Sequence, residues 1–222
     1  MMKRRRESHF FIAIMFLFAF VLWTVLVCVA DVRAIGPCGS SVGLATLNEY
    51  VHGLTGVHLT LYTITDWLGL VPVAVAFGFA ALGLVQWIKR KSILKADRSL
   101  LVLGGLYMIV AAIYVFFETV AINYRPVLIN DCLEASYPSS TTMLVMCVMP
   151  TARMQLNARI KNKMFRRGIS HAIALFIAFM VVGRLISGVH WVSDIIGGAL
   201  ISTGFVMMYA SICEELFAKK VP

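Results

Sequence analysis

The sequence predicts an all-α integral membrane protein, with six transmembrane helices in a single domain that covers residues 1–222. Hydrophobic residues make up 60% of the chain and charged residues only 14%, and the mean hydropathy is +0.85. A soluble domain is about half apolar and about a quarter charged. The apolar residues form segments of roughly 17–23 residues, and about 20 helical residues cross a bilayer core. No repeat, linker or low-complexity segment divides the chain.

The first span is expected to be a retained signal-anchor helix, because its apolar run is too long for a typical signal peptide. A short amphipathic helix is expected on the membrane surface in the first outer connection. It would begin at Ser40 or Ser41. Its polar face would carry Asn48, Glu49 and His52. The six spans are expected at about 9–30, 66–88, 99–120, 141–157, 169–187 and 191–213.

Lysine and arginine are concentrated in alternate connections between these spans. Seventeen of the 20 lie on one side, in residues 3–6, 89–98, 153–167 and the tail that holds Lys219 and Lys220. The positive-inside rule therefore predicts a multi-pass protein of the cell membrane with both termini in the cytoplasm. This topology accounts for the net charge of +9, so nucleic acid is not an expected partner.

The positions of the cysteines allow one disulfide bond on the outer side of the membrane. Cys38 and Cys132 both fall in outer connections, outside the reducing cytosol, and they either pair or remain free thiols. No C-x-x-C or H-x-x-x-H pattern occurs, so no metal site is expected.

The stretch from Gly183 to Asp194, GRLISGVHWVSD, places three chemically able side chains at the boundary between two spans. Arg184 can hold a phosphate group with a planar fork of donors. His190 can act as a nucleophile or proton carrier, and Asp194 can fix its tautomer and stabilise its cation. If Trp191 and the following residues are helical, His190 and Asp194 form an i, i+4 pair. Such groups at a membrane boundary predict a functional site.

Two further polar clusters lie on the same predicted side of the membrane. Arg125-Pro126 follows the third span, which ends near the ionisable Glu118. Residues 138–141, PSST, directly precede the fourth span, where a serine or threonine can simply cap the helix. The free N–H groups and dipole of a helix N-terminus can also bind an anion. The three clusters together predict an outward-facing site.

This set of clusters resembles the three signatures of the type 2 phosphatidic acid phosphatase family: K-x6-R-P, P-S-G-H and S-R-x5-H-x3-D. They occur here in the family's order, over about residues 66–213. The third signature is complete except that Gly183 replaces its serine. The first keeps Arg125-Pro126, but Glu118 replaces its lysine.

The second signature departs further from the family. Pro138 and Ser139 match it, whereas Ser140 replaces glycine and Thr141 replaces histidine. In the family that histidine protonates the leaving group, and threonine is a very poor acid at neutral pH. A general acid typically contributes about 10²–10⁴-fold to the rate.

The resemblance implies a six-span hydrolase that removes phosphate without a metal or other cofactor. It implies that His190 is the nucleophile and forms a phosphohistidine, and that Asp194 orients it. The remaining matched positions would hold the substrate phosphate through Arg125, Arg184 and the backbone amides around Ser139, Ser140 and Thr141.

The altered second signature favours a substrate with a good leaving group. Loss of the acid matters least when the leaving group is the phosphate end of a diphosphate. The expected substrate is therefore a lipid diphosphate, such as an undecaprenyl-type carrier, and a lipid monophosphate such as phosphatidic acid is the other candidate. The substrate would enter the site laterally from the membrane lipid.

Two alternatives are weighed against this hypothesis. The missing acid could be replaced by Glu118, His52 or His58. Each has a plainer interpretation: Glu118 as the ion-pair partner of an arginine, and the two histidines as ordinary residues of the membrane interface.

The second alternative is that the chain is a catalytically impaired family member. It would then bind or help to transport lipid phosphates, or act as a scaffold. The retained His190 and Asp194 favour the enzyme, because a scaffold needs neither.

Overall fold

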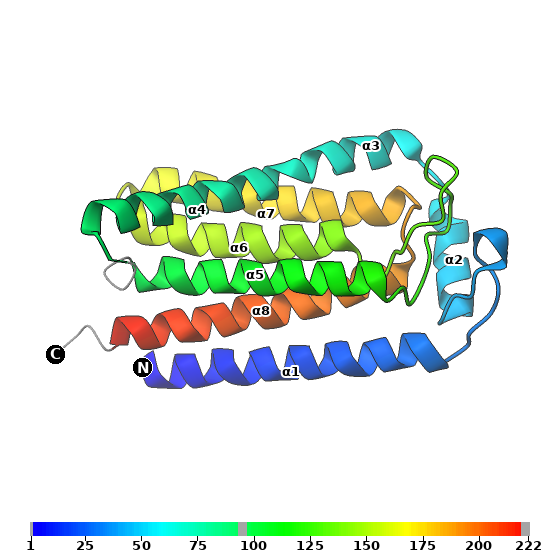
Figure 1. The fold of residues 1–222 in the computed structure, drawn as a ribbon, viewed down its shortest axis with the longest axis horizontal. Coiled ribbons are helices and arrows are strands. Elements are labelled where there is room, and N and C mark those ends of the chain that lie inside the picture. The colour runs from blue at the N-terminus through cyan, green and yellow to red at the C-terminus, as the bar shows by residue number, and fades with distance from the viewer. Residues whose placement is uncertain (1, 93–96, 219–222) are drawn as a thin grey trace.

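The fold is seen in a computed structural model of the chain, which describes residues 2–92 and 97–218. Lys219, Lys220 and part of the basic stretch 89–98, which contribute to the predicted charge bias, lie outside the described residues. Figure 1 shows long helices running side by side. The helices are α1 (Met2–Val29), α2 (Ala45–Thr55), α3 (Leu59–Leu68), α4 (Leu70–Arg90), α5 (Arg98–Thr119), α6 (Ser140–Arg159), α7 (Lys163–Ile186) and α8 (Val192–Ala218), with a 3-10 turn at Pro37–Gly39.

Side-chain caps fix where three helices begin. Asp97 accepts a hydrogen bond from the Ser99 N–H group at the start of α5, and Asn162 caps α7 in the same way. Ser139 caps α6 by accepting from the N–H group of Thr142. A short polar side chain at this position satisfies a backbone donor that has no intrahelical partner.

The second predicted span begins earlier than expected. α3 and α4 together form one continuous apolar segment, Leu59–Arg90, rather than a helix that starts near residue 66. Gly69 joins them with right-handed helical angles, φ −60° and ψ −20°. The charged Asp66 was predicted to mark the start of this span, at the membrane surface. It lies within the helix instead, where its carboxylate pairs with Arg184 of the neighbouring α7. The first outer connection is correspondingly shorter.

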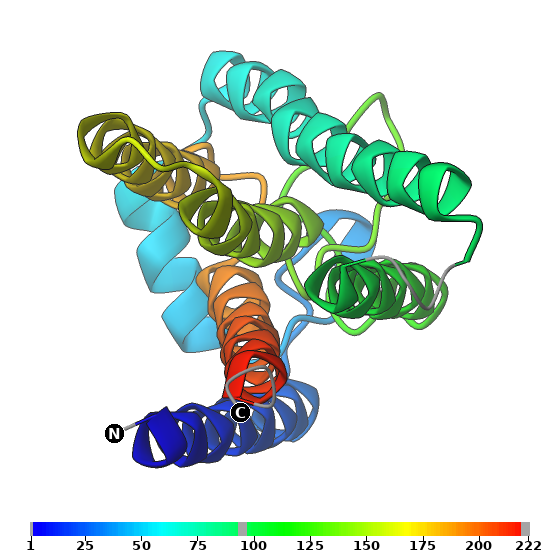
Figure 2. The same ribbon diagram turned by 90° about the vertical axis from the view of Figure 1, so that its left-hand side faces the viewer.

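Among the described residues, five helical segments are long and apolar enough to cross a membrane: α1, α3–α4, α5, α7 and α8. The predicted fourth span, α6, is not one of them, so the count of six is not established. α6 contacts α4, α5, α7 and α8, and Figure 2 shows it surrounded by them. Its polar Gln155 is buried against Ser99 and the hydroxyl of Tyr209. Apolarity is a weak signal for α6 because protein, and not lipid, surrounds much of it.

The surface helix of the first connection is present as α2, but two details of its prediction are wrong. It is preceded by Leu44, in a left-handed conformation (φ 49°), and not capped by Ser40 or Ser41. Its Asn48, expected on the polar outer face, is fully buried because it bonds to Ser193 at the start of α8. α2 lies across one end of the bundle, as Figure 1 shows.

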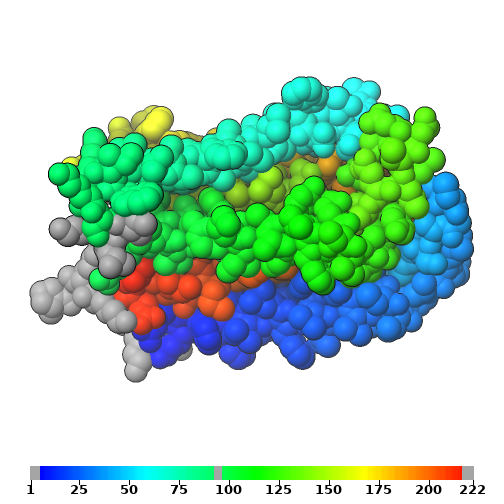
Figure 3. Space-filling view, viewed as in Figure 1, coloured from blue at the N-terminus to red at the C-terminus, as the bar shows by residue number. Residues whose placement is uncertain are grey.

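α8 organises the end of the bundle that carries α2. It packs along α1 and α6, and two glycines let other segments approach closely. A Cβ atom on Gly197 would lie 2.7 Å from the ring of Tyr137, and one on Gly198 would lie 3.0 Å from the carbonyl oxygen of Ser139. In the space-filling view, the segment before α6 covers this end beside the first connection (Figure 3).

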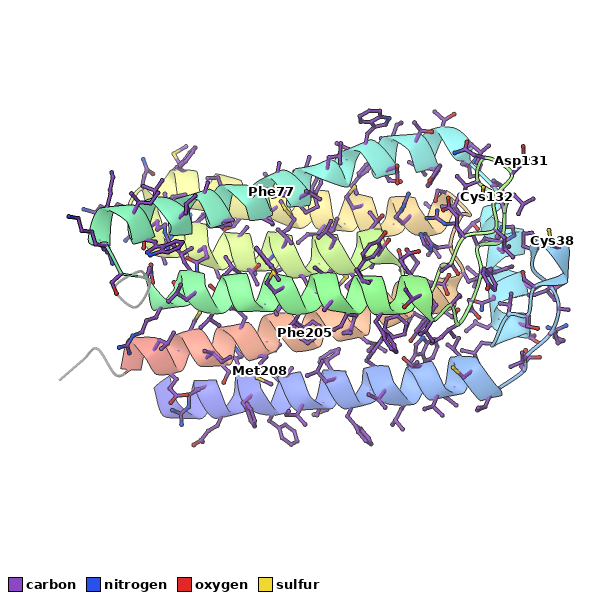
Figure 4. The ribbon with its side chains drawn as sticks, in the orientation of Figure 1. Cys38, Phe77, Asp131, Cys132, Phe205 and Met208 are labelled. Atoms are coloured by element: carbon purple, nitrogen blue, oxygen red, sulfur yellow. The ribbon has the colours of Figure 1, made fainter. Side chains whose placement is uncertain are left out.

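The disulfide option is not realised. Cys38 and Cys132 are both free and exposed. Figure 4 shows them on separate loops at the α2 end of the bundle. One lies in the 3-10 turn, and the other closes the tight loop in which Ile129 and Cys132 bond to each other.

Candidate active site

The turn between α7 and α8 holds the histidine and aspartate of the third signature. The helix begins at Val192, so His190 lies just before it and not in its first turn. The Nδ1 atom of His190 is 3.8 Å from the Oδ2 atom of Asp194. This distance is about 1 Å longer than a hydrogen bond, so the two side chains are adjacent but not bonded.

Asp194 is fully buried and surrounded by donors. Its Oδ2 atom accepts from the N–H group of Trp191 at 3.0 Å. Its Oδ1 atom accepts from Nδ2 of Asn123 at 3.2 Å and from the hydroxyl of Ser193 at 3.4 Å.

His190 is 3% exposed, and neither ring nitrogen has a hydrogen-bond partner. Burial lowers the pKa of His190 to about 4; the charges of Arg125 and Arg184 lower it further, and Asp194 opposes them. The imidazole is therefore neutral at pH 7, as a nucleophile must be.

Arg184 is buried at the end of α7, with 1% of its surface exposed. Its Nη2 atom donates to the hydroxyl of Thr141 at 2.8 Å and to Oδ1 of Asp66 at 3.3 Å. Its Nη1 atom lies 3.4 Å from the hydroxyl of Thr65, and the guanidinium lies 5.0 Å from the centre of the Tyr62 ring. The guanidinium thus joins α3, α6 and α7.

Arg125 approaches the same aromatic ring from the segment between α5 and α6. Its guanidinium lies 5.8 Å from the centre of the Tyr62 ring, and its Nε atom is 3.0 Å from a carboxylate oxygen of Glu134. Its Nη1 atom is buried without a hydrogen-bond partner. Two guanidinium groups therefore flank one tyrosine close to His190, and each is paired with one carboxylate.

The N-terminus of α6 lies beside the start of α8. The N–H group of Ser139 donates to the carbonyl oxygen of Asp194 at 3.0 Å, so this amide is already used. Ser140 and Thr141 occupy the first turn of α6, where N–H groups have no intrahelical partner. Of the three amides predicted to bind phosphate, the two after Ser139 are the better placed.

A small cavity of about 10 Å³ opens beside His190, room for about one water molecule. Glu118 and Ser140 line it with His190. Of the three alternative acids, Glu118 is thus the one that shares a cavity with the histidine.

The two other candidate acids lie beyond the α7–α8 turn. Nε2 of His52 is 3.1 Å from the carbonyl oxygen of Gly188, and its ring lies 5.4 Å from that of Trp191. His58 is exposed, with Nε2 2.9 Å from the carbonyl oxygen of Thr55. Neither lines the cavity beside His190.

Sequence reasoning missed the residues that surround the predicted ones. The carboxylates of Asp66 and Glu134 were visible near the expected interface, but nothing local showed that they pair with arginines. The buried amides of Asn48 and Asn123 gave no signal, because asparagine is common in exposed connections. In the described part of the chain, no group of three or more His, Cys, Asp or Glu side chains could hold a metal ion.

Comparison with known proteins agrees with the geometry. Residues 116–216 match the model of the PAP2 superfamily, and this range holds all three signature clusters. The fold is similar to the crystal structure of a transmembrane PAP2 type phosphatidylglycerolphosphate phosphatase from Bacillus subtilis, with a TM-score of 0.56 and 15% identity over 95% of this chain and 97% of that chain. No curated protein sequence matches. Residues 116–216 are thus similar to the PAP2 superfamily, and the chain has the fold of a transmembrane PAP2 type protein.

Proposed function

We propose that this protein is a lipid-phosphate or lipid-diphosphate phosphatase that works through a phosphohistidine on His190. One observation carries the proposal: a neutral, buried imidazole lies beside a buried aspartate, two guanidinium groups and the N-terminus of α6. A nucleophile, its orienting group and cationic phosphate ligands are the parts that phosphoryl transfer needs.

The proposed reaction has two steps. The Nε2 atom of His190 attacks phosphorus, the bond from phosphorus to the leaving oxygen breaks, and Asp194 accepts a hydrogen bond from the Nδ1–H group. Water then attacks the phosphohistidine, the phosphorus–nitrogen bond breaks, and inorganic phosphate leaves. The 3.8 Å gap between Nδ1 and Asp194 closes in the first step, when the imidazole gains positive charge.

The substrate phosphate would replace the carboxylates now paired with the two arginines. Asp66 is largely exposed and Glu134 partly exposed, so both can turn to solvent. The buried, unpartnered Nη1 atom of Arg125 and Nε atom of Arg184 supply further donors. The amides of Ser140 and Thr141 complete the proposed phosphate site.

The leaving group separates two versions of this proposal. A diphosphate needs no strong acid, because its departing phosphate is stable. A monophosphate leaves a basic alkoxide, for which Glu118 is the proton donor favoured by the cavity. Glu118→Gln should therefore slow release from a polyprenyl monophosphate by about 10²-fold or more. It should change release from a polyprenyl diphosphate by only a few fold.

We also propose that α6 completes six spans and that the site faces outward. The first described turn of α1 and the last described turn of α8 lie at one end of the bundle and α2 at the other, as Figure 1 shows. Cys132 is free and exposed at the α2 end, which makes it a reporter. A membrane-impermeant maleimide should label Cys132 on intact cells, and labelling only after lysis would reverse the orientation.

The main experiment measures phosphate release by the purified protein in detergent with excess chelator. Polyprenyl diphosphate, polyprenyl monophosphate and phosphatidic acid would be compared, with His190→Ala as the test variant. His171→Ala is the matched control, because His171 is an exposed histidine near the opposite end of α7. Release that persists in the control and disappears in His190→Ala supports the phosphatase.

The alternative function is a protein that binds lipid phosphates without hydrolysing them. The replaced signature histidine and the carboxylates on both arginines favour it. No release from any of the three lipids, combined with saturable binding that Arg184→Ala abolishes, would establish this alternative.

A further inference from the structure

Asn123 lies at the centre of a buried polar network behind Asp194. It follows α5, is fully buried, and contacts two other segments of the chain. Its Oδ1 atom accepts from the N–H group of Gly43 at 3.1 Å. Its Nδ2 atom donates to Oδ1 of Asp194 at 3.2 Å and to the hydroxyl of Ser193 at 3.3 Å. Because Gly43 can only donate there, the network itself fixes which end of the amide faces the carboxylate.

A second buried amide holds the neighbouring residue. Asn48 of α2 accepts from the N–H group of Ser193 at 3.1 Å and donates to its hydroxyl at 2.9 Å. It also donates to the carbonyl oxygen of Gly43 at 2.7 Å. The two asparagines therefore share Gly43 and Ser193, but of the two it is Asn123 that bonds to Asp194.

These bonds divide the two carboxylate oxygens of Asp194 between different tasks. Oδ1 accepts from Asn123 and Ser193, so it faces away from the imidazole. Oδ2 accepts from Trp191 and is the oxygen 3.8 Å from Nδ1 of His190. Rotation of the carboxylate would break these bonds in the interior, where an unmade hydrogen bond is costly. The hydrogen bonds to Oδ1 therefore fix the orientation of Oδ2 toward the histidine.

We propose that Asn123 is a positioning residue, which holds Oδ1 of Asp194 so that Oδ2 faces Nδ1 of His190 across 3.8 Å and favours the Nδ1–H tautomer. The tautomer matters because Nε2 can attack phosphorus only when it carries no proton. The catalytic consequence rests on the proposed phosphatase function, but the tautomer itself does not. The first outer connection therefore also supports the site, because Gly43 and α2 complete the hydrogen-bond network around Asn123.

The test reads the tautomer of His190 directly, without turnover. Protein labelled with ¹⁵N-histidine would be studied by NMR in detergent at pH 7, and His190→Gln would assign the signal. The wild type should show the Nδ1–H tautomer. Asn123→Leu removes the donor at similar volume and should shift most of the population to Nε2–H. Asn48→Leu is the matched control, because it removes an equally buried amide that bonds to Ser193 but not to Asp194.

A conservative variant separates positioning from general loosening. In Asn123→Asp, two carboxyl groups about 3.2 Å apart share one proton, and the protonated group donates as the amide did. This variant should retain the Nδ1–H tautomer at pH 7, even if its melting temperature falls. It also keeps the test informative if Asn123→Leu does not fold.

Three results would overturn the proposal: an Nε2–H tautomer in the wild type, an unchanged tautomer in Asn123→Leu, or the same change in Asn48→Leu. In an active protein, Asn123→Leu should also lower kcat by about 10–100-fold, a loss typical of removing a residue that orients a functional group, with KM changed less than about twofold. If no substrate is hydrolysed, the phosphatase proposal fails, while the tautomer still decides the role of Asn123.

Discussion

His190 should make the stability of the protein depend on pH between about 4 and 6.5. Its pKa is lowered from 6.5 to about 4, first by burial and then by the charges of Arg125 and Arg184, against the opposing effect of Asp194. In this window the unfolded chain binds a proton at His190 and the folded chain does not. The free energy of unfolding therefore falls as the pH falls, and the contribution is present in full above about 6.5.

The magnitude follows from the two pKa values. One pKa unit corresponds to about 1.4 kcal/mol, so the whole window is worth about 3 kcal/mol. Between pH 7.5 and pH 5 the loss is about 2 kcal/mol, because pH 5 lies about one unit above the folded-state pKa and the last part of the window is not crossed. For a chain of this size that is a fall of about 4–8 °C in melting temperature.

The assay compares variants, because other groups also titrate. Thermal unfolding in detergent would be followed by tryptophan fluorescence at pH 7.5 and pH 5 for the wild type, His190→Gln and His171→Gln. The wild type and His171→Gln should lose about 4–8 °C more on acidification than His190→Gln does. Equal losses in all three proteins would mean that the folded state protonates His190 as readily as the unfolded state. The inference that His190 is a buried nucleophile and neutral at pH 7 would then be wrong.

Three smaller changes test single contacts. Asp66→Asn should tighten binding of inorganic phosphate, measured by thermal shift, by up to about fivefold, because a pair between the buried Arg184 and the exposed carboxylate of Asp66 is worth about 1 kcal/mol. Weaker binding would show that the carboxylate positions the arginine. Gly188→Ala should cost about 1–3 kcal/mol or more of stability, since φ is +69° and the new Cβ would collide with the carbonyl oxygen of Gly56. Trp23→Phe should cost about 1 kcal/mol, because it removes a 3.0 Å bond to a carbonyl oxygen at the start of α8; an unchanged melting temperature would contradict either.

The elements that the sequence predicts well are those whose signal is local. Each apolar run of about 20 residues predicts a helix, because a segment in lipid must satisfy its own backbone hydrogen bonds. The spacing from Arg184 to Asp194 is local too, and the structure brings both side chains close to His190. Arg125 joins them from a distant segment, and here the resemblance to a family supplied what spacing could not.

The remaining parts depend on contacts between distant segments. Asp66 and Arg184 are 118 residues apart, and Asn48 and Ser193 are 145 apart. An asparagine that bonds to a buried backbone has the same local pattern as one that faces water. The face of α2 was therefore assigned wrongly. The unexpected start of the second span at Leu59 has the same origin, because the partner of Asp66 lies on α7.

Gly183 shows how packing explains the missing serine of the third signature. A Cβ atom at this position would lie 2.9 Å from the Cγ2 methyl of Thr65, because α3 packs closely on α7 here. Gly183→Ser alone should therefore destabilise the protein by about 1–3 kcal/mol through overpacking. Thr65→Ser removes that methyl but keeps the hydroxyl near Arg184, so the double variant should recover most of the loss. The melting temperatures of the four proteins form a double-mutant cycle. Additive effects would mean that α3 does not constrain this position, and that the glycine has another cause.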